Sequence, residues 1–405
     1  MSDEFTPVLR FLVMSDTHYQ DEPSPARERT EQGLRIGRRI AAAHPTYRRL
    51  DAVAVVGDFA DRGSEAQYQA FHASLEQELT DETKRILSVA SHEFNATVEV
   101  AYERLARIFG QPPDVHEVIS GFHFISISPS SGTSYDGAKQ AWAAGELAKA
   151  AADDPKRPIF FFQHPHVSDT VYGSIMWGDY DLTAILMNYP QVIDFSGHSH
   201  APVNDPRSIH QDYFTCLGTG TMHYFELDEF DKYYGTHPPL CEQAGQMLIV
   251  EADAGNRVRV TPYDVLTDQP FPFVWSIDCP SDPDTFQYTN SKRRAAARPP
   301  FFPPEAKLTV HDVTSSGAAL TFDQAAARQD YVNDYRVRVF READGTIVRQ
   351  LALWSGYYFS DMPETLSLDL TDLTPGTAYR VEILARGFWE NVSENGLTGR
   401  FVTEN

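Results

Sequence analysis

The sequence has few cysteines, and this scarcity excludes two classes of protein. Cys216, Cys241 and Cys279 are odd in number and lie far apart in the chain. A disulfide framework and a thiolate metal site both need several cysteines at short, recurring spacings. We therefore expect neither, and interpret the three residues as buried free thiols.

Positive charge is also scarce. The chain has 34 lysines and arginines against 57 aspartates and glutamates, which gives a formal net charge of −23. Nucleic acids and anionic membranes select basic surfaces, so we expect neither as a partner. The same imbalance repels a phosphate-bearing substrate at long range. An anion site in this chain therefore needs local positive charge, from a metal ion or from an arginine.

The beginning of the chain lacks the features of a secretory signal. Residues 1–7 are largely polar, and the apolar run at 8–14 is too short for a signal core or a membrane span. We expect a cytoplasmic protein, and an extracytoplasmic one only if a signal has been removed. The sequence does not predict the oligomeric state.

Periodic patterns divide the chain into three parts. Strand and helix patterns alternate from residue 8 to about residue 196, which is typical of a layered α/β fold, and strand-like runs at 213–263 predict a second, antiparallel sheet. A basic and then proline-rich stretch is typical of a linker. About seven short strand patterns follow, with a tyrosine-corner pattern at 373–379, as in β-sandwich domains. We predict a domain at 1–287, a linker at 288–304 and an all-β domain at 305–405.

Polar residues with metal-binding chemistry follow five of the expected strands. The clusters are Asp16 and His18; Asp58, Asp61 and Arg62; Ser91 and His92; His164 and His166; and His198 and His200. In open α/β sheets, ligands bind beyond the carboxyl ends of the strands. One such histidine is more often a structural residue, but five clusters at five strand ends predict a metal site at that edge.

In this order, the motifs resemble those of the calcineurin-like metallophosphoesterase superfamily. They are Asp16-x-His18, Gly57-Asp58-x-x-Asp61-Arg62, Ser91-His92-Glu93, His164 and Gly197-His198-Ser199-His200, and the resemblance covers about residues 8 to 265. It implies a four-layer αββα sandwich and a hydrolase of phosphoric esters that uses two metal ions. The C-terminal domain resembles a fibronectin type III module, an immunoglobulin-like sandwich.

The resemblance also implies the metal ligands. Asp58 would bridge the two ions. The other ligands would divide into one set for each ion: Asp16, His18 and His200, and Ser91, His164 and His198. Imidazole and carboxylate donors without thiolate suit Mn, Fe or Zn better than Ca or Mg. A hydroxide that bridges the metals would attack phosphorus.

Three further residues have implied or open catalytic roles. The resemblance implies that His92 supports departure of the leaving group and that Asp61 holds the His92 ring, as a general acid requires. Arg62 either clamps a phosphate oxygen or braces Asp58. His166 either contacts substrate or, as is commoner for such a histidine, is a structural residue of a loop. The glycine-punctuated aromatic loop at 172–178 is either a lid or leaving-group pocket or a packed surface loop.

Position 91 departs from the family pattern. The family has Gly-Asn-His followed by an acidic residue, and this chain has Ala90-Ser91-His92-Glu93. Three readings remain: weaker binding of the second metal in an active enzyme, a site that works with one metal or another ion, or an inactive domain kept for binding or scaffolding. Because Asp61 and His92 are both present, we favour the first reading. The expected substrate is a small-molecule phosphate ester, and the motifs do not decide between monoester and diester.

Overall fold

The computed structural model describes residues 4–227, 229 and 231–405, and the chain forms two compact units. The first unit contains the described part of residues 1–228 together with Leu240–Asn290. The second contains Glu229–Pro239 and Ser291–Asn405, so a short segment from the middle of the chain belongs with the C-terminal residues. The sequence patterns do not predict this assignment. Within the described residues, no helix is long and apolar enough to cross a membrane.

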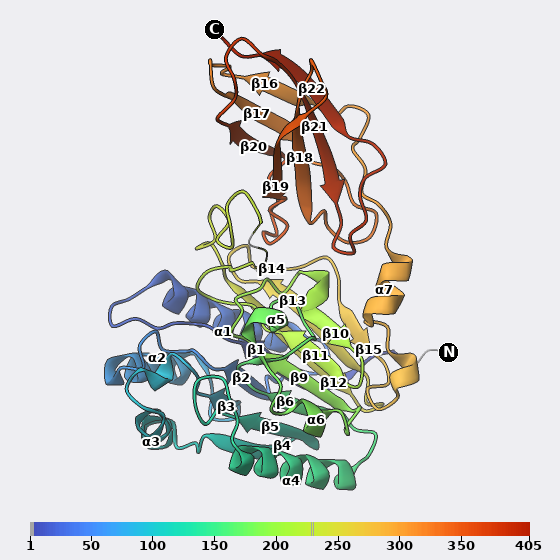
Figure 1. Ribbon diagram of the computed structural model, residues 1–405. Coiled ribbons are helices and arrows are strands. Elements are labelled where there is room, and N and C mark those ends of the chain that lie inside the picture. The colour runs from blue at the N-terminus through green and yellow to red at the C-terminus, as the bar shows by residue number, and fades with distance from the viewer. Residues whose placement is uncertain (1–3, 228, 230) are drawn as a thin grey trace. The chain divides into compact units, whose positions relative to one another are not determined.

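Two mixed β-sheets form the centre of the first unit (Figure 1). The strands of the first sheet, in spatial order, are β14 (Gln269–Pro270), β13 (Val258–Asp264), β12 (Gln246–Asp253), β1 (Pro7–Met14), β2 (Ala52–Val56) and β3 (Lys84–Ser88), with β15 (Trp275–Ile277) also on β13. Those of the second sheet are β10 (Ile209–Gln211), β11 (Thr215–Gly218), β9 (Val192–Ser196), β6 (Ile159–Phe162), β5 (Phe122–Ile127) and β4 (Asp114–Ile119). Strands β1, β2 and β3 are parallel, as are β5, β6, β9 and β11.

The separate antiparallel sheet that we expected at 213–263 does not form. Strand β12 pairs antiparallel with β1, and β13 pairs with β12, so both extend the first sheet. Strand β11 joins the second sheet, beside β9. Residues 222–227, also expected as a strand, are irregular. The physical reason is the open edge of β1, whose unpaired backbone groups need a neighbouring strand.

Helices cover the outer faces of the two sheets and complete four layers. On the first sheet lie α1 (Pro25–Ala43), α2 (Glu65–Glu78) and α3 (Val98–Phe109), and on the second lie α4 (Gly137–Asp153) and the short α6 (Thr183–Leu186). Local sequence sets where these helices begin. Ser64 forms a capping box with Gln67 at the start of α2, and Asp136 accepts two backbone N–H bonds at the start of α4.

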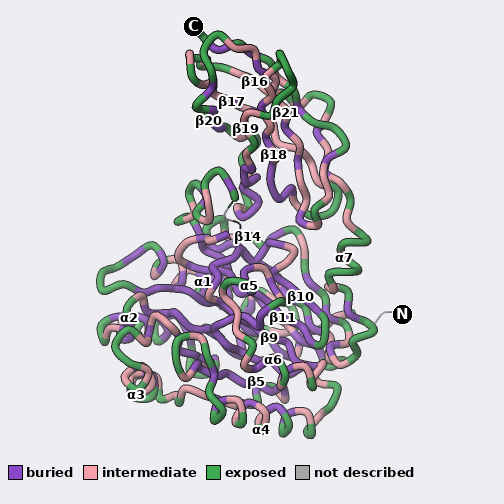
Figure 2. Tube along the Cα trace, in the orientation of Figure 1, coloured by how far each residue is buried: buried purple, intermediate pink, exposed green. Residues whose placement is uncertain are grey.

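The core between the sheets is aromatic. The ring of Phe11 in β1 meets the rings of Phe124 and Phe160 of the opposite sheet edge-on, with centroids 4.9 and 4.8 Å apart. All three side chains are fully buried, and Figure 2 shows the central strands as the most buried part of the first unit. Burial of each such ring stabilises the fold by about 1.5–3 kcal/mol, which holds both sheets and therefore both sets of strand ends in a fixed position.

The second unit is a sandwich of two antiparallel sheets, as expected. Its strands are β16 (Leu308–His311), β17 (Ala318–Asp323) and β20 (Thr365–Leu370) in one sheet, and β19 (Ile347–Trp354), β18 (Asp334–Arg341), β21 (Ala378–Arg386) and β22 (Leu397–Val402) in the other. The tyrosine corner is present, because the N–H of Thr374 donates to the hydroxyl of Tyr379 at 2.9 Å. The helix α7 (Asn290–Ala296) includes the first part of the basic run of the expected linker.

All three cysteines are free. Cys216 is buried, as expected, whereas Cys241 and Cys279 are only partly buried, so the expectation of three buried thiols was wrong for two of them. Both lie in irregular segments and not in a strand that faces the core.

The buried carboxylate of Glu93 joins the loops that follow β2 and β3. Its two oxygens accept hydrogen bonds from the backbone N–H groups of Asp58 at 3.0 Å, Ala60 at 2.7 Å and Ala90 at 2.8 Å. Burial, with the nearby charge of Asp58, raises the pKa of Glu93 well above its ordinary value. Glu93 therefore ties two strand ends together at the cost of a buried charge.

We predict that Glu93→Gln destabilises the first unit by about 1–3 kcal/mol, because an amide nitrogen would replace one acceptor and oppose a backbone N–H group. Denaturant unfolding of the metal-free protein measures this change. Glu22→Gln, at an exposed position, is the matched control. Equal unfolding midpoints for the two variants would refute the role assigned to Glu93.

Candidate metal centre

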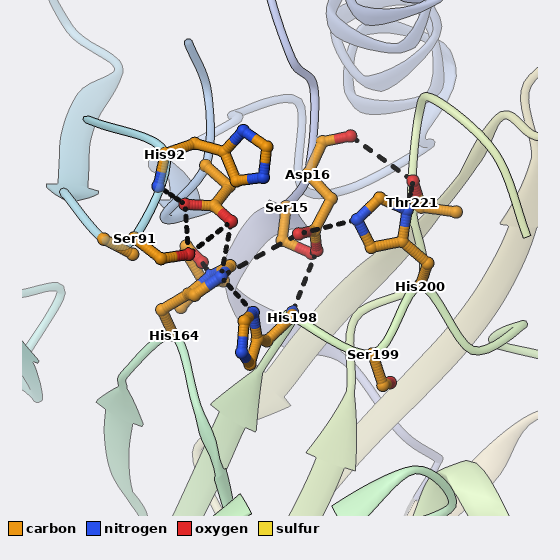
Figure 3. Close-up of polar contacts among 12 residues, drawn as sticks. Ser15, Asp16, Ser91, His92, His164, His198, Ser199, His200 and Thr221 are labelled. Atoms are coloured by element: carbon orange, nitrogen blue, oxygen red, sulfur yellow. Dashed lines mark hydrogen bonds and ion pairs between the residues drawn. The ribbon is translucent and has the colours of Figure 1, made fainter. Parts of the chain in front are cut away.

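The carboxyl ends of five strands bring the predicted ligands together. Strands β1, β2 and β3 of the first sheet lead into Asp16 and His18, into Asp58, and into Ser91, respectively. Strands β6 and β9 of the second sheet lead into His164 and into His198 and His200. Figure 3 shows the labelled side chains of Asp16, Ser91, His92, His164, His198 and His200 directed towards one common region. The site therefore lies where the ends of both sheets meet.

One group of possible ligands consists of Asp16, His18 and His200, all buried. The Oδ1 atom of Asp16 lies 3.9 Å from Nε2 of His18 and 3.4 Å from Nε2 of His200. The two Nε2 atoms are 3.2 Å apart. Three donor atoms at these separations can surround one cation.

A second group consists of Asp58, His164 and His198. The Oδ2 atom of Asp58 lies 3.0 Å from Nε2 of His164, which lies 3.1 Å from Nδ1 of His198. Asp58 also forms a set with His18 and His92 whose ligand atoms lie within 4.8 Å of one another. The carboxylate of Asp58 is therefore close to members of both groups.

The hydrogen bonds of His164 and His200 direct their Nε2 atoms into the site. Nδ1 of His164 donates to the carbonyl of Val56 at 2.7 Å, and Nδ1 of His200 donates to the carbonyl of Tyr224 at 2.9 Å. In the neutral rings, the Nε2 atoms then present lone pairs to the site. Among the described residues, the buried Oδ1 atom of Asp16 has no hydrogen-bond donor. These donors fit a metal ion.

The backbone is strained at most of these positions. Five of the six histidine and aspartate ligands have positive φ angles: Asp16 at 51°, His18 at 39°, Asp58 at 49°, His198 at 73° and His200 at 54°. Residues with a Cβ rarely adopt this conformation, and such strain persists only where the surrounding structure imposes it. The sharp turns point successive side chains back over the strand ends.

The charges of the site act on one another strongly. Burial would lower the pKa of His164, but the carboxylate of Asp58, followed by that of Asp16, raises it to about 10. Burial would raise the pKa of Asp58, but the nearby histidines, His164 first, hold it well below its ordinary value. Burial, reinforced by the charge on His164, lowers the pKa of His198 to about 4. Without a metal, one proton on His164 therefore takes the place of a cation beside Asp58.

Ser91 and His92 contact Asp58 directly. The hydroxyl of Ser91 donates to Oδ2 of Asp58 at 3.1 Å, and the backbone N–H of His92 donates to Oδ1 at 2.9 Å. Ser91, which stands where the family pattern has asparagine, thus contacts the carboxylate of Asp58. The His92 ring meets the ring of His18 edge-on, with centroids 4.4 Å apart.

Asp61 holds His92 through its backbone and not through its carboxylate, which corrects one expectation. Nδ1 of His92 donates to the carbonyl oxygen of Asp61 at 2.7 Å. The carboxylate lies instead 3.8 Å from Nδ1 of His18 and 3.5 Å from Nε of Arg62. The tight turn after β2 places the carbonyl, and not the longer side chain, against the ring.

The structure also distinguishes between the two roles open to Arg62. Its side chain is 79% exposed and its guanidinium lies beside Asp61. It faces solvent beside Asp61, a position that does not support the role of bracing Asp58.

His166 does not face the site opening. It is fully buried and its two ring nitrogens contact the hydroxyls of Ser196 at 2.8 Å and Ser199 at 2.7 Å. Burial lowers its pKa to about 3, so the ring is neutral. His166 supports the loop that carries His198 and His200, so of its two predicted roles the structure agrees with that of a structural loop histidine.

The loop after His166 packs against the loop that carries His198 and His200. Short strands β7 (His166–Val167) and β8 (Gly178–Asp179) flank α5 (Ser174–Trp177), and the Trp177 ring meets the His198 ring edge-on at 5.1 Å. A Cβ at Gly173 would lie 2.4 Å from Cβ of Ser199, so only glycine permits this approach. In the same loop, the side chains of Ile175 and Met176 are 81% and 53% exposed.

Sequence reasoning missed His223 and Tyr224. The His223 ring lies 4.9 Å from that of His18, and the Tyr224 ring lies 4.3 Å from that of His200. Both follow β11 in a segment whose apolar pattern predicted a strand, and neither stands directly after a strand. Their position depends on how the irregular segment turns back over the site, for which the sequence gives no local signal.

Comparison with known proteins bears on both units. Residues 9–202 match the family model of the calcineurin-like phosphoesterases, and residues 302–394 match that of the fibronectin type III domain. Among curated proteins, none matches the chain.

Solved structures resemble different parts of the chain. A purple acid phosphatase, PPD1, from yellow lupin (Lupinus luteus) seeds has 13% identity over 67% of this chain, with a TM-score of 0.48, and the chain spans 55% of its length. A fibronectin type III domain of human collagen XX has 22% identity over 26% of this chain and 96% of its own, with a TM-score of 0.20.

The family match, which begins within β1 and ends just after His200, contains every ligand position described above. The fold of the first unit and the donor chemistry of its site agree with that match. Residues 9–202 therefore form a calcineurin-like phosphoesterase domain, the domain type of phosphoric ester hydrolases, and residues 302–394 form a fibronectin type III domain.

Proposed function

We propose that the chain is a dinuclear metal-dependent hydrolase of small phosphate esters. The observation that carries this proposal is the position of Asp58, whose carboxylate lies within reach of both groups of imidazoles. One group would hold an ion through Asp16, His18 and His200, and the other through His164 and His198, with Asp58 between them. Nitrogen and oxygen donors without thiolate support Mn, Fe or Zn as the bound metals.

When bound, two such ions supply Lewis acidity for the phosphate oxygens and lower the pKa of water so that it can attack phosphorus. The protein itself orients the ligand side chains. The backbone carbonyls that hold His164 and His200 fix the nitrogens that face the ions, so the site needs little reorganisation. Arg62, exposed at the rim, is free to reach an outer phosphate oxygen.

His92 is placed to assist the leaving group. The carbonyl of Asp61 keeps a proton on Nδ1 and fixes the plane of the ring, and the ring lies against His18 at the side of the site away from His198. When Nε2 also carries a proton, it can donate that proton to the oxygen that departs from phosphorus. A carbonyl partner orients the ring without neutralising that positive charge.

Ser91 lies on the side of the site where we expect the metal ion to bind more weakly. Its hydroxyl is a neutral donor on a short side chain, and it is directed to Asp58. The second ion would then rest on Asp58, His164 and His198, with at most a weak contact to Ser91. This arrangement supports an active enzyme whose second metal exchanges more easily than the first.

Hydrolysis of aryl phosphates tests the proposed function. We expect the metal-free protein to be inactive, and Mn²⁺, Fe²⁺ or Zn²⁺ to restore turnover of p-nitrophenyl phosphate or bis-p-nitrophenyl phosphate. In a series of aryl esters, His92→Asn should slow poor leaving groups by about 10²–10⁴-fold and p-nitrophenolate much less. His44→Asn, at a position outside the metal centre, is the control. Absence of turnover of both esters with every metal would exclude the hydrolase.

Ser91→Asn tests the assignment of the weak side. An amide oxygen is a longer and better ligand than a hydroxyl, so we expect the second ion to bind about tenfold or more tightly. Titration of the metal-free protein, followed by metal analysis after dialysis, measures this affinity. Unchanged retention of the second ion in the variant would show that position 91 does not limit its binding.

Metal binding should release protons. The pKa of His164 is raised to about 10, so its ring is protonated near neutral pH in the metal-free protein, and, against the effect of burial, the carboxylate of Asp16 also raises the pKa of His200. A metal must displace the proton on His164, and its apparent affinity should therefore rise with pH until His164 has titrated. Calorimetric titration in two buffers of different ionisation enthalpy measures the released protons. A binding enthalpy that does not depend on the buffer would contradict the prediction.

A further inference from the structure

The two oxygen atoms of the Asp16 carboxylate have different surroundings. Oδ2 accepts two hydrogen bonds, one from the hydroxyl of Ser15 at 2.5 Å and one from the backbone N–H of His198 at 3.1 Å. Oδ1 has no hydrogen-bond donor among the described residues. It lies 3.9 Å from Nε2 of His18 and 3.4 Å from Nε2 of His200. The protein therefore holds one oxygen and directs the other to the nitrogen atoms that would surround an ion.

Ser15 directly follows β1, and its side chain is fully buried. A hydroxyl has only one proton to donate, and that of Ser15 lies near two acceptors, Oδ2 of Asp16 and the carbonyl oxygen of Gly220 at 3.0 Å. A carboxylate is the stronger acceptor and forms the shorter hydrogen bonds. The short distance to Asp16 agrees with donation to the carboxylate. Figure 3 shows the side chain of Ser15 beside that of Asp16.

Thr219 orients the hydroxyl of Ser15. It directly follows β11, is fully buried, and its hydroxyl lies 2.8 Å from that of Ser15 and 3.0 Å from the carbonyl oxygen of Ser196. That carbonyl already accepts the backbone N–H of Thr219 at 2.9 Å. When Ser15 donates its proton to Asp16, its lone pairs remain free to accept the proton of Thr219. The hydroxyls thus form a chain of hydrogen bonds from Thr219 through Ser15 to Asp16.

The surrounding backbone leaves this chain of hydroxyls little freedom. A Cβ at Gly197 would lie 2.5 Å from Oγ of Ser15 and 2.7 Å from Oδ2 of Asp16, so only glycine permits this close approach. The chain also joins the two sheets, because Ser15 follows a strand of the first sheet and Thr219 follows a strand of the second. The direction of the Asp16 carboxylate is therefore set by the ends of both sheets.

We propose that Ser15 and Thr219 are positioning residues of the metal centre, which hold Oδ2 of Asp16 and so present Oδ1 to the ion. A ligand that is held in place before the ion arrives loses less conformational freedom when the ion binds. Hydrogen bonds behind a metal ligand commonly raise metal affinity for this reason. The proposal rests on the proposed function, since it assigns both hydroxyls to the ion beside Asp16, His18 and His200.

Ser15→Ala tests this proposal in the full-length protein loaded with one equivalent of Mn²⁺. The variant removes one of the two donors to Oδ2, so we expect the dissociation constant of the ion, measured by competition with a chelator, to rise about 10–100-fold. Ser126→Ala is the matched control. Ser126 is also buried, but its hydroxyl has no hydrogen-bond partner among the described residues, and the variant should bind Mn²⁺ as the wild-type protein does.

Two variants of Thr219 separate the role of its hydroxyl from that of its volume. Thr219→Val keeps the shape of the side chain without the hydroxyl and should weaken Mn²⁺ binding by about three- to tenfold. Thr219→Ser keeps the hydroxyl and should bind Mn²⁺ as the wild-type protein does. Because Thr219 acts through Ser15, the addition of Thr219→Val to Ser15→Ala should weaken binding by no more than about a further twofold.

The outcomes separate this proposal from the proposed function. Wild-type affinity for Mn²⁺ in Ser15→Ala overturns the positioning role, and so does an equal loss of affinity in Ser126→Ala. Effects of Ser15→Ala and Thr219→Val that multiply in the double variant overturn the chain of hydroxyls. Wild-type protein that binds Mn²⁺ but hydrolyses no ester contradicts the proposed function, and the affinities of the variants then still decide whether Ser15 positions Asp16.

Discussion

The buried carboxylate of Asp58 sets the constraint on which the rest of the site depends. It lies between two groups of imidazoles, it is fully enclosed, and a second buried carboxylate, Asp16, stands nearby. Two buried carboxylates repel each other and lose their hydration, so the arrangement needs positive charge at its centre. Without metal, a proton on His164, whose pKa is raised to about 10, supplies part of that charge. Bound metal ions would supply this positive charge and leave the histidine Nε2 atoms unprotonated, so that these atoms could act as ligands.

The fold meets this constraint by making the strand ends rigid. The phenylalanine core fixes the two sheets against each other, and Glu93 ties the loop of Asp58 to that of Ser91. On this base, Asp16, Asp58 and His200 keep unfavourable backbone angles. Strain of this kind is stable only where the surrounding packing exceeds its cost. The strained backbone of the metal centre therefore depends on the packing of the aromatic core between the two sheets.

Much of the metal centre can be predicted from the sequence, and the reason is geometric. Parallel strands end at a common edge, so residues that directly follow strands, such as Asp16, Asp58 and His164, can be assigned to one site from the order of the motifs. Contacts that depend on the direction of the backbone in a turn or loop cannot be predicted from the sequence in this way. The motifs do not predict that Asp61 holds His92 by its carbonyl, since that contact depends on the turn after β2. His223 reaches the site through an irregular segment, and periodicity carries no information about such segments.

The central claim is that two metal ions share Asp58. Anomalous diffraction from crystals of the metal-loaded protein tests it most directly, because it counts the ions and locates them. We predict two peaks that flank the Asp58 carboxylate, one beside Asp16, His18 and His200 and the other beside His164 and His198, with the second lower in occupancy. A single peak at saturating metal, or two peaks of which neither contacts Asp58, would contradict it.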